Sequence, residues 1–154
     1  MGSLTFLLAT CAGRPVDDKE HFLQVITSSK KVLVMRVAAG MALLMAGTAL
    51  WVLGAQPVAV GLFSSPWDKL AHIATFALIG CAAGIASGAK GWFRIACCVA
   101  ASFAVGAADE MHQVYLPGRS ASWADLAADA AGGLTGAALL HFTEAFWSRQ
   151  FRNR

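Results

Sequence analysis

Residues 109–125 read DEMHQVYLPGRSASWAD, a polar stretch placed between two long apolar runs. The stretch contains the adjacent acids Asp109 and Glu110, a Pro-Gly turn, Arg119 and a further acid, Asp125. Charged side chains at the mouth of two membrane helices are costly unless they pair, reach water or serve a function. We therefore interpret this stretch as a hairpin between two hydrophobic helices, and as half of a polar site at one membrane face.

The composition of the chain predicts a membrane protein. Hydrophobic residues make up 57% of the 154 residues and charged residues only 14%, whereas soluble domains carry about 25% charged residues. The apolar residues also fall in blocks that approach or exceed the roughly 20 residues a helix needs to cross a bilayer. The sequence has no basic stripe with interleaved aromatic residues, so we expect no nucleic-acid partner.

The apolar blocks predict an all-α fold, an integral membrane four-helix bundle. The expected spans are at about 32–53, 70–87, 92–108 and 123–146, within a transmembrane domain over 32–147. Residues 1–31 are expected to form a short peripheral segment, with 14–31 as a short amphipathic helix along the surface. Residues 148–154 form a basic tail.

The basic residues predict that the N- and C-termini are both cytoplasmic. Most of them flank the first span, the second connection or the tail: Arg14, Lys19, Lys30, Lys31, Arg36, Lys90, Arg94, Arg149, Arg152 and Arg154. The other side has only Lys69 and Arg119 among the loops and span ends. Cytoplasmic loops are enriched in Lys and Arg, so we expect a multi-pass protein of the cell (inner) membrane with an outward-facing polar site.

Two small-residue motifs predict close helix packing. Gly80, Gly84 and Gly88 recur every four residues, and Gly132 and Gly136 repeat the spacing in the fourth span. Such spacing places small residues on one helix face and allows a neighbouring helix to approach closely.

Asp68 and His72 are four residues apart, so on a helix they share a face. A carboxylate in that position could fix the tautomer of His72, as it does for catalytic and metal-binding histidines. The alternative is that Asp68 only caps the start of its helix. Capping does not explain His72, which lies one turn deeper toward lipid. We interpret the pair as functional.

The remaining acids differ in how well structure alone explains them. Asp109 and Glu110 lie at the end of a helix, where negative charge opposes the helix dipole, so a cation or Arg119 would have to compensate. Asp125 begins the next helix, where capping explains it nearly as well as function. Asp129 lies one turn further in and needs a partner, a proton or a watery cavity.

Arg119 follows the Pro117-Gly118 turn, which would direct its guanidinium back over the helices. The planar guanidinium suits a carboxylate or a phosphate. Alternatively, Arg119 forms an ion pair with Glu110 or Asp125 and latches the hairpin. Both interpretations stay open, and a latch is compatible with a site.

Two segments carry a resemblance to a known family. Residues 68–80, DKLAHIATFALIG, and 109–137, DEMHQVYLPGRSASWADLAADAAGGLTGA, resemble in their order the VanZ-like family of small membrane proteins. The resemblance covers about 67–140. Phe76 stands where many relatives have tyrosine, and Asp129 where asparagine is common. The resemblance implies a helical membrane protein of the cell envelope whose namesake is linked to resistance to the glycopeptide teicoplanin, and it implies no agreed reaction.

Two functions remain open for the site. In the first, it binds a lipid headgroup or a lipid-linked envelope intermediate as a binding or accessory protein. In the second, it is an enzyme that acts on a polyprenyl phosphate or a phospholipid, with His72 as general acid or base. We favour the first, and a protein partner or an oligomer is also left open.

The site residues divide into three expected roles. His72, Asp68 and Glu110 would be catalytic. Arg119, Gln113, Asp125 and Asp129 would bind substrate. Asp109, Glu110 and Asp125 would hold a divalent cation, Mg²⁺ or Ca²⁺, because hard oxygen ligands suit these ions.

Overall fold

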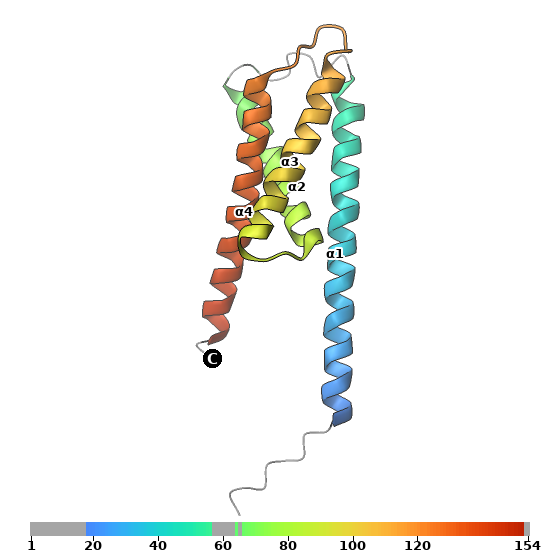
Figure 1. Ribbon diagram of the computed structural model, residues 1–154, viewed down its shortest axis with the longest axis vertical. Coiled ribbons are helices and arrows are strands. Elements are labelled where there is room, and N and C mark those ends of the chain that lie inside the picture. The colour runs from blue at the N-terminus through green and yellow to red at the C-terminus, as the bar shows by residue number, and fades with distance from the viewer. Residues whose placement is uncertain (1–17, 57–63, 65, 153–154) are drawn as a thin grey trace, which may run out of the picture. The chain divides into compact units, whose positions relative to one another are not determined.

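The computed structural model describes residues 18–56, 64 and 66–152, and within these residues all regular structure is helical. The helices are α1 (Asp18–Gly54), α2 (Trp67–Ser87), α3 (Gly91–Gln113) and α4 (Trp123–Arg152) (Figure 1). The all-α prediction is confirmed. The chain divides into two compact units, Met1–Val34 and Met35–Arg154. All the predicted site residues belong to the second unit.

The helices extend beyond the expected spans. The helix α1 begins at Asp18, so the described part of the expected peripheral segment, 18–31, is the first part of α1 rather than a separate helix; residues 1–17 lie outside the described residues. Similarly, α3 continues through Asp109 and Glu110 to Gln113. The expected spans were limited to the apolar residues that suit lipid. The helices are longer because their backbone hydrogen bonding continues through the polar residues at the ends of these spans.

Among the described residues, the helical segments Phe22–Gly54, Trp67–Ser87 and Gly91–Gln113 are long and apolar enough to cross a membrane. They expose large apolar side chains such as Leu78 and Phe93, as expected of helices that face lipid. The helix α4 carries more polar residues and is less apolar than these three segments, so the fourth span stays a prediction. It nevertheless packs against both α2 and α3 (Figure 1).

Glycines allow α4 to approach α2 closely. A Cβ atom added to Gly136 would lie 2.5 Å from the carbonyl oxygen of Ala77, and one added to Gly132 would lie 2.7 Å from Cβ of Phe76. On α2, a Cβ atom at Gly80 would lie 3.0 Å from Cα of Gly133. The backbones are therefore in direct contact, which confirms the predicted close packing at Gly80, Gly132 and Gly136.

Two further glycines complete the core. The predicted role of Gly84 is confirmed, because a Cβ there would lie 2.7 Å from Sγ of Cys98 on α3. Gly133, which the spacing did not single out, faces α3, and its Cβ would lie 2.9 Å from the carbonyl oxygen of Cys98. The face of α4 that contains Gly132 and Gly133 is thus covered by α2 on one side and α3 on the other.

Gly88 has a different role from the one predicted. It is the C-cap of α2, with φ of 63°, and its N–H donates to the carbonyl oxygen of Ile85 at 3.2 Å. Arg36 of α1 donates from Nε to the carbonyl oxygen of Ala86 at 3.1 Å and from Nη2 to that of Ser87 at 2.8 Å. The last carbonyls of a helix lack partners within the helix, so this arginine satisfies them, and glycine leaves room for its guanidinium.

Candidate functional site

The start of α2, the end of α3 and the start of α4 meet at one end of the second unit. Three contacts tie them together: His72 of α2 with Asp129 of α4, Lys69 of α2 with Asp125 of α4, and Glu110 of α3 with the backbone of Ser122 just before α4. The predicted residues therefore converge, although several of the predicted pairings are different.

His72 pairs with Asp129. Its Nδ1 atom lies 2.7 Å from Oδ1 of Asp129, and the side chain of Asp129 is 1% exposed whereas that of His72 is 24% exposed. Gly106 of α3 faces the carboxylate of Asp129 so closely that any side chain there would collide with it. The sequence left the partner of Asp129 open, and the structure supplies it.

This pairing has a chemical consequence for the imidazole. When Nδ1–H donates to a carboxylate, the tautomer is fixed and Nε2 becomes the basic nitrogen. The ring also lies nearly parallel to that of Phe76, with centroids 6.0 Å apart and an angle of 4° between the planes. A buried acid on one side and an aromatic ring one turn further along the helix hold His72 in a single orientation.

Asp68 does not orient His72, which corrects the pairing expected from their spacing. Asp68 accepts a hydrogen bond from the backbone N–H of Lys69 at 2.8 Å, and its Oδ2 lies 3.0 Å from Nζ of Lys69. Its carboxylate is held at the first turn of α2. Sharing a helix face places two side chains within reach, but Asp68 pairs with the nearer cation instead.

Lys69 links α2 to α4 through Asp125. Its Nζ forms ion pairs with both Asp68 and Asp125, and the pair with Asp125 joins the first turns of the two helices. In the sequence, Lys69 stood out only as a charge on the outward side. The sequence did contain an indication of this ion pair. Lys69 directly follows Asp68 at the start of one helix, and Asp125 lies at the start of another.

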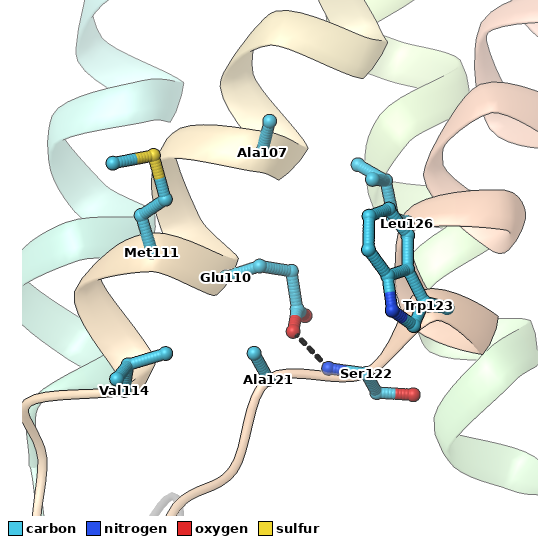
Figure 2. Close-up of a pocket in the computed structure, with 8 residues that line it drawn as sticks. All are labelled: Ala107, Glu110, Met111, Val114, Ala121, Ser122, Trp123 and Leu126. Atoms are coloured by element: carbon cyan, nitrogen blue, oxygen red, sulfur yellow. Dashed lines mark hydrogen bonds between the residues drawn. The ribbon is translucent and has the colours of Figure 1, made fainter.

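Glu110 lies in a pocket between α3 and α4. The residue is 6% exposed, and its Oε2 accepts a hydrogen bond from the backbone N–H of Ser122. Its Oε1 is buried and has no hydrogen-bond partner within the described residues. The pocket has a volume of about 280 Å³ and, apart from Glu110 and Ser122, an apolar lining: Ala107, Met111, Val114, Ala121, Trp123 and Leu126 (Figure 2).

Asp109, Gln113 and Arg119 lie toward the end of α1. Gln113 Nε2 donates to Oδ2 of Asp109 at 2.8 Å, the contact that their four-residue spacing allows. Arg119 follows Gly118, whose φ is 77°, and its Nη2 donates to the carbonyl oxygen of Gly54 at 3.3 Å. Of the partners expected for a latch, neither Glu110 nor Asp125 bonds to Arg119 in the described part of the chain, and the end of α1 is contacted instead.

The described residues contain no group of three or more His, Cys, Asp or Glu side chains that could hold a metal ion. The three expected ligands are directed to different partners: Asp109 to Gln113, Glu110 to the backbone of Ser122, and Asp125 to Lys69. These three side chains do not converge on one point among the described residues, so the Mg²⁺ or Ca²⁺ site stays a prediction.

The charge of this end of the bundle is acidic. Five acids are present, Asp68, Asp109, Glu110, Asp125 and Asp129, against two permanent cations, Lys69 and Arg119. Asp129 lies within electrostatic range of Asp109 and Asp125 as well as of His72. Fixed negative charge of this kind favours ligands with a positive group.

A comparison with protein families identifies the chain. The model of the family described as VanZ/LLP1 matches residues 17–144, which include nearly all of the described helices. The chain belongs to the VanZ/LLP1 family. The match extends further than the resemblance over 67–140, because it also covers the whole of α1.

The VanZ/LLP1 assignment agrees with the presence of several helices that are apolar enough to cross a membrane, so the chain is a multi-pass membrane protein. Neither the comparison with curated proteins nor the comparison with solved structures returned a match. What the protein does therefore has to follow from the chemistry of its site.

Proposed function

We propose that this VanZ/LLP1 protein binds the polar headgroup of an envelope lipid, or of a lipid-linked envelope intermediate, on the outward face of the cytoplasmic membrane. The observation that carries the proposal is the pair formed by His72 and Asp129, in which a fully buried carboxylate holds a partly exposed imidazole. The imidazole would contact the ligand, and the acid would keep it in place.

The energetics of the pair support a role beyond structure. Buried charged pairs often contribute less to stability than apolar residues of the same volume would, and an acid inside a membrane helix carries a further cost. The chain nevertheless places Asp129 where Gly106 is needed to make room for it. The cost of burying Asp129 is explained if the protein needs Nε2 of His72 to point toward a ligand in a fixed direction.

The position of the site also supports a headgroup ligand. Trp67 begins α2 and Trp123 begins α4, and both are exposed, Trp123 at 87%. Tryptophan is enriched at the level of the lipid headgroups. Lys69, Asp68 and Asp125 lie within one turn of these tryptophans, which supports a position of the polar cluster at headgroup depth.

The second candidate is an enzyme acting on a polyprenyl phosphate or a phospholipid. The hydrogen bond that Nδ1–H of His72 donates to Asp129 favours it, because it leaves Nε2 of His72 free to give or take a proton. The sequence has no nucleophile motif such as GxSxG. A catalytic version of the site would therefore use His72 to activate water or a hydroxyl of the substrate.

We expect the substitution His72→Ala to reduce the lipid retained by the purified protein about tenfold, since a hydrogen bond to a charged group is worth about that factor. Native mass spectrometry of protein extracted from membranes measures the retained lipid and identifies any converted product. The matched control is His141→Ala, because His141 is exposed and lies about three turns along α4 from Asp129.

Equal retention by the wild-type protein and His72→Ala would contradict the proposed site. Retention combined with a converted lipid that disappears in His72→Ala would establish the enzyme. Retention without conversion, lost in His72→Ala and kept in His141→Ala, would establish the binding protein.

We also propose that binding of such a lipid underlies a link to glycopeptide resistance. Expression of the wild-type chain in a teicoplanin-susceptible host should raise the inhibitory concentration of teicoplanin several-fold, and His72→Ala should abolish the increase. An increase that is unchanged by His72→Ala would separate resistance from this site.

A further inference from the structure

The pocket between α3 and α4 combines an apolar lining with one buried carboxylate. The side chain of Glu110 extends from α3 toward α4, with Met111 and Val114 on the α3 side and Trp123 and Leu126 on the α4 side (Figure 2). Met111, Val114 and Trp123 are exposed on the outer surface. The pocket therefore lies beside exposed apolar side chains, as expected of a surface that faces lipid.

The start of α4 supplies one hydrogen bond to the carboxylate of Glu110. Ser122 precedes the first turn of α4, and its hydroxyl accepts the N–H of Asp125 at 3.3 Å in the manner of an N-cap. The backbone N–H of Ser122 donates to Oε2 of Glu110. A carboxylate at a helix N-terminus interacts favourably with the helix dipole and with free N–H groups.

The second oxygen of Glu110 has no such support. Its Oε1 is buried and has no hydrogen-bond partner within the described residues. The nearby cation Lys69 is already shared by Asp68 and Asp125. Because leaving a buried carboxylate oxygen unpaired is unfavourable, a donor from outside the chain would be accommodated with a gain in free energy.

We infer that this pocket binds the primary ammonium group of a membrane amphiphile, with the ammonium donating to Oε1 of Glu110 and the apolar chain lying against Met111, Val114 and Leu126. This inference rests on the proposed function and names the class of its ligand. Charge complementarity supports it, because the surrounding cluster holds five acids and two permanent cations. A phosphate alone would be repelled by the same acids.

An amphiphile with an ammonium group could be an aminophospholipid or a free long-chain amine, which share the same donor. The experiment uses the full chain in lipid nanodiscs made from equal parts of phosphatidylethanolamine and phosphatidylglycerol. Lipid that stays with the protein on release is quantified by native mass spectrometry. Parallel arms replace phosphatidylethanolamine with phosphatidylcholine, or add dodecylamine as a competitor.

The expected result is retention of phosphatidylethanolamine over phosphatidylglycerol by about tenfold. Phosphatidylcholine, whose methylated ammonium has no N–H donor, should be retained less. Glu110→Gln should abolish the preference, since the amide keeps the volume and can still accept from Ser122 but has lost the charge. Glu144→Gln is the matched control: Glu144 is exposed and pairs with Arg94, with Nη2 and Oε2 2.7 Å apart, away from the pocket.

Displacement of phosphatidylethanolamine by dodecylamine would support the ammonium as the recognised group, and no displacement would overturn that assignment. Equal retention of both phospholipids, or an unchanged preference in Glu110→Gln with normal thermal stability, would overturn the inference. If retention in either case still depends on His72, the proposed function survives. If no lipid is retained above the detergent background, both fail.

Discussion

Replacing Gly136 with alanine is expected to destabilise the packing of α2 against α4 by about 1–3 kcal/mol or more. The added methyl group would lie 2.5 Å from the carbonyl oxygen of Ala77 and 2.9 Å from the backbone nitrogen of Cys81. Both atoms belong to the backbone of α2, so no side-chain rotation can relieve the contact and the helices must separate. Thermal unfolding in detergent, followed by circular dichroism, measures the loss.

The matched control for this substitution is Gly47→Ala on α1. A Cβ atom there would lie 4.0 Å from Cγ1 of Val105, an ordinary van der Waals distance. The change in stability should be within about 0.5 kcal/mol. If Gly136→Ala and Gly47→Ala unfold at the same temperature as the wild-type protein, then α2 and α4 are not in direct backbone contact.

Asp129→Ala is expected to have the second large effect, a loss of about 1–3 kcal/mol in stability together with the loss of lipid retention. The substitution removes the partner of His72 Nδ1 and leaves a space beside Gly106. Asp129→Asn should keep most of both properties, because the amide oxygen can accept from Nδ1–H in nearly the same volume. Lipid retention and thermal unfolding are measured for both variants.

The double variant His72→Ala/Asp129→Ala tests whether the two residues act as one unit. Residues in direct contact usually show interaction energies of about 0.5–3 kcal/mol in such a cycle. We therefore expect the double variant to lose little more lipid retention than either single variant. Fully additive losses would mean that Asp129 acts on the ligand independently of His72.

Some sequence patterns that act within one helix gave correct predictions, although the spacing of Asp68 and His72 and the inclusion of Gly88 did not. The apolar blocks located the helices α1, α2 and α3 and the packed part of α4. The close approach at Gly80, Gly84, Gly132 and Gly136 also follows from their spacing. These predictions depend only on which residues share a face of one helix, and the spacing of residues in the sequence gives that directly.

Pairings between helices could not be predicted in the same way. Whether His72 meets Asp68 or Asp129 depends on how α2 and α4 are rotated about their axes, and nothing local in the sequence sets that rotation. The same reason separates Arg119 from Glu110 and directs it to Gly54. The carboxylate of Asp129 lies against Gly106 of α3, where any side chain would collide with it. A glycine in the third apolar span was the sequence feature that fits this position of Asp129.

The burial of Asp129 between α2 and α3 also bears on how the chain enters the membrane. An Asp within a membrane helix opposes insertion, and α4 falls short of the apolarity that the segments of the other three helices reach. Asp129 is buried against α2 and α3, which are synthesised before α4. If α4 spans the membrane as predicted, we expect its stable insertion to depend on α2 and α3 already being in the bilayer, so that α4 enters as part of an assembly rather than alone.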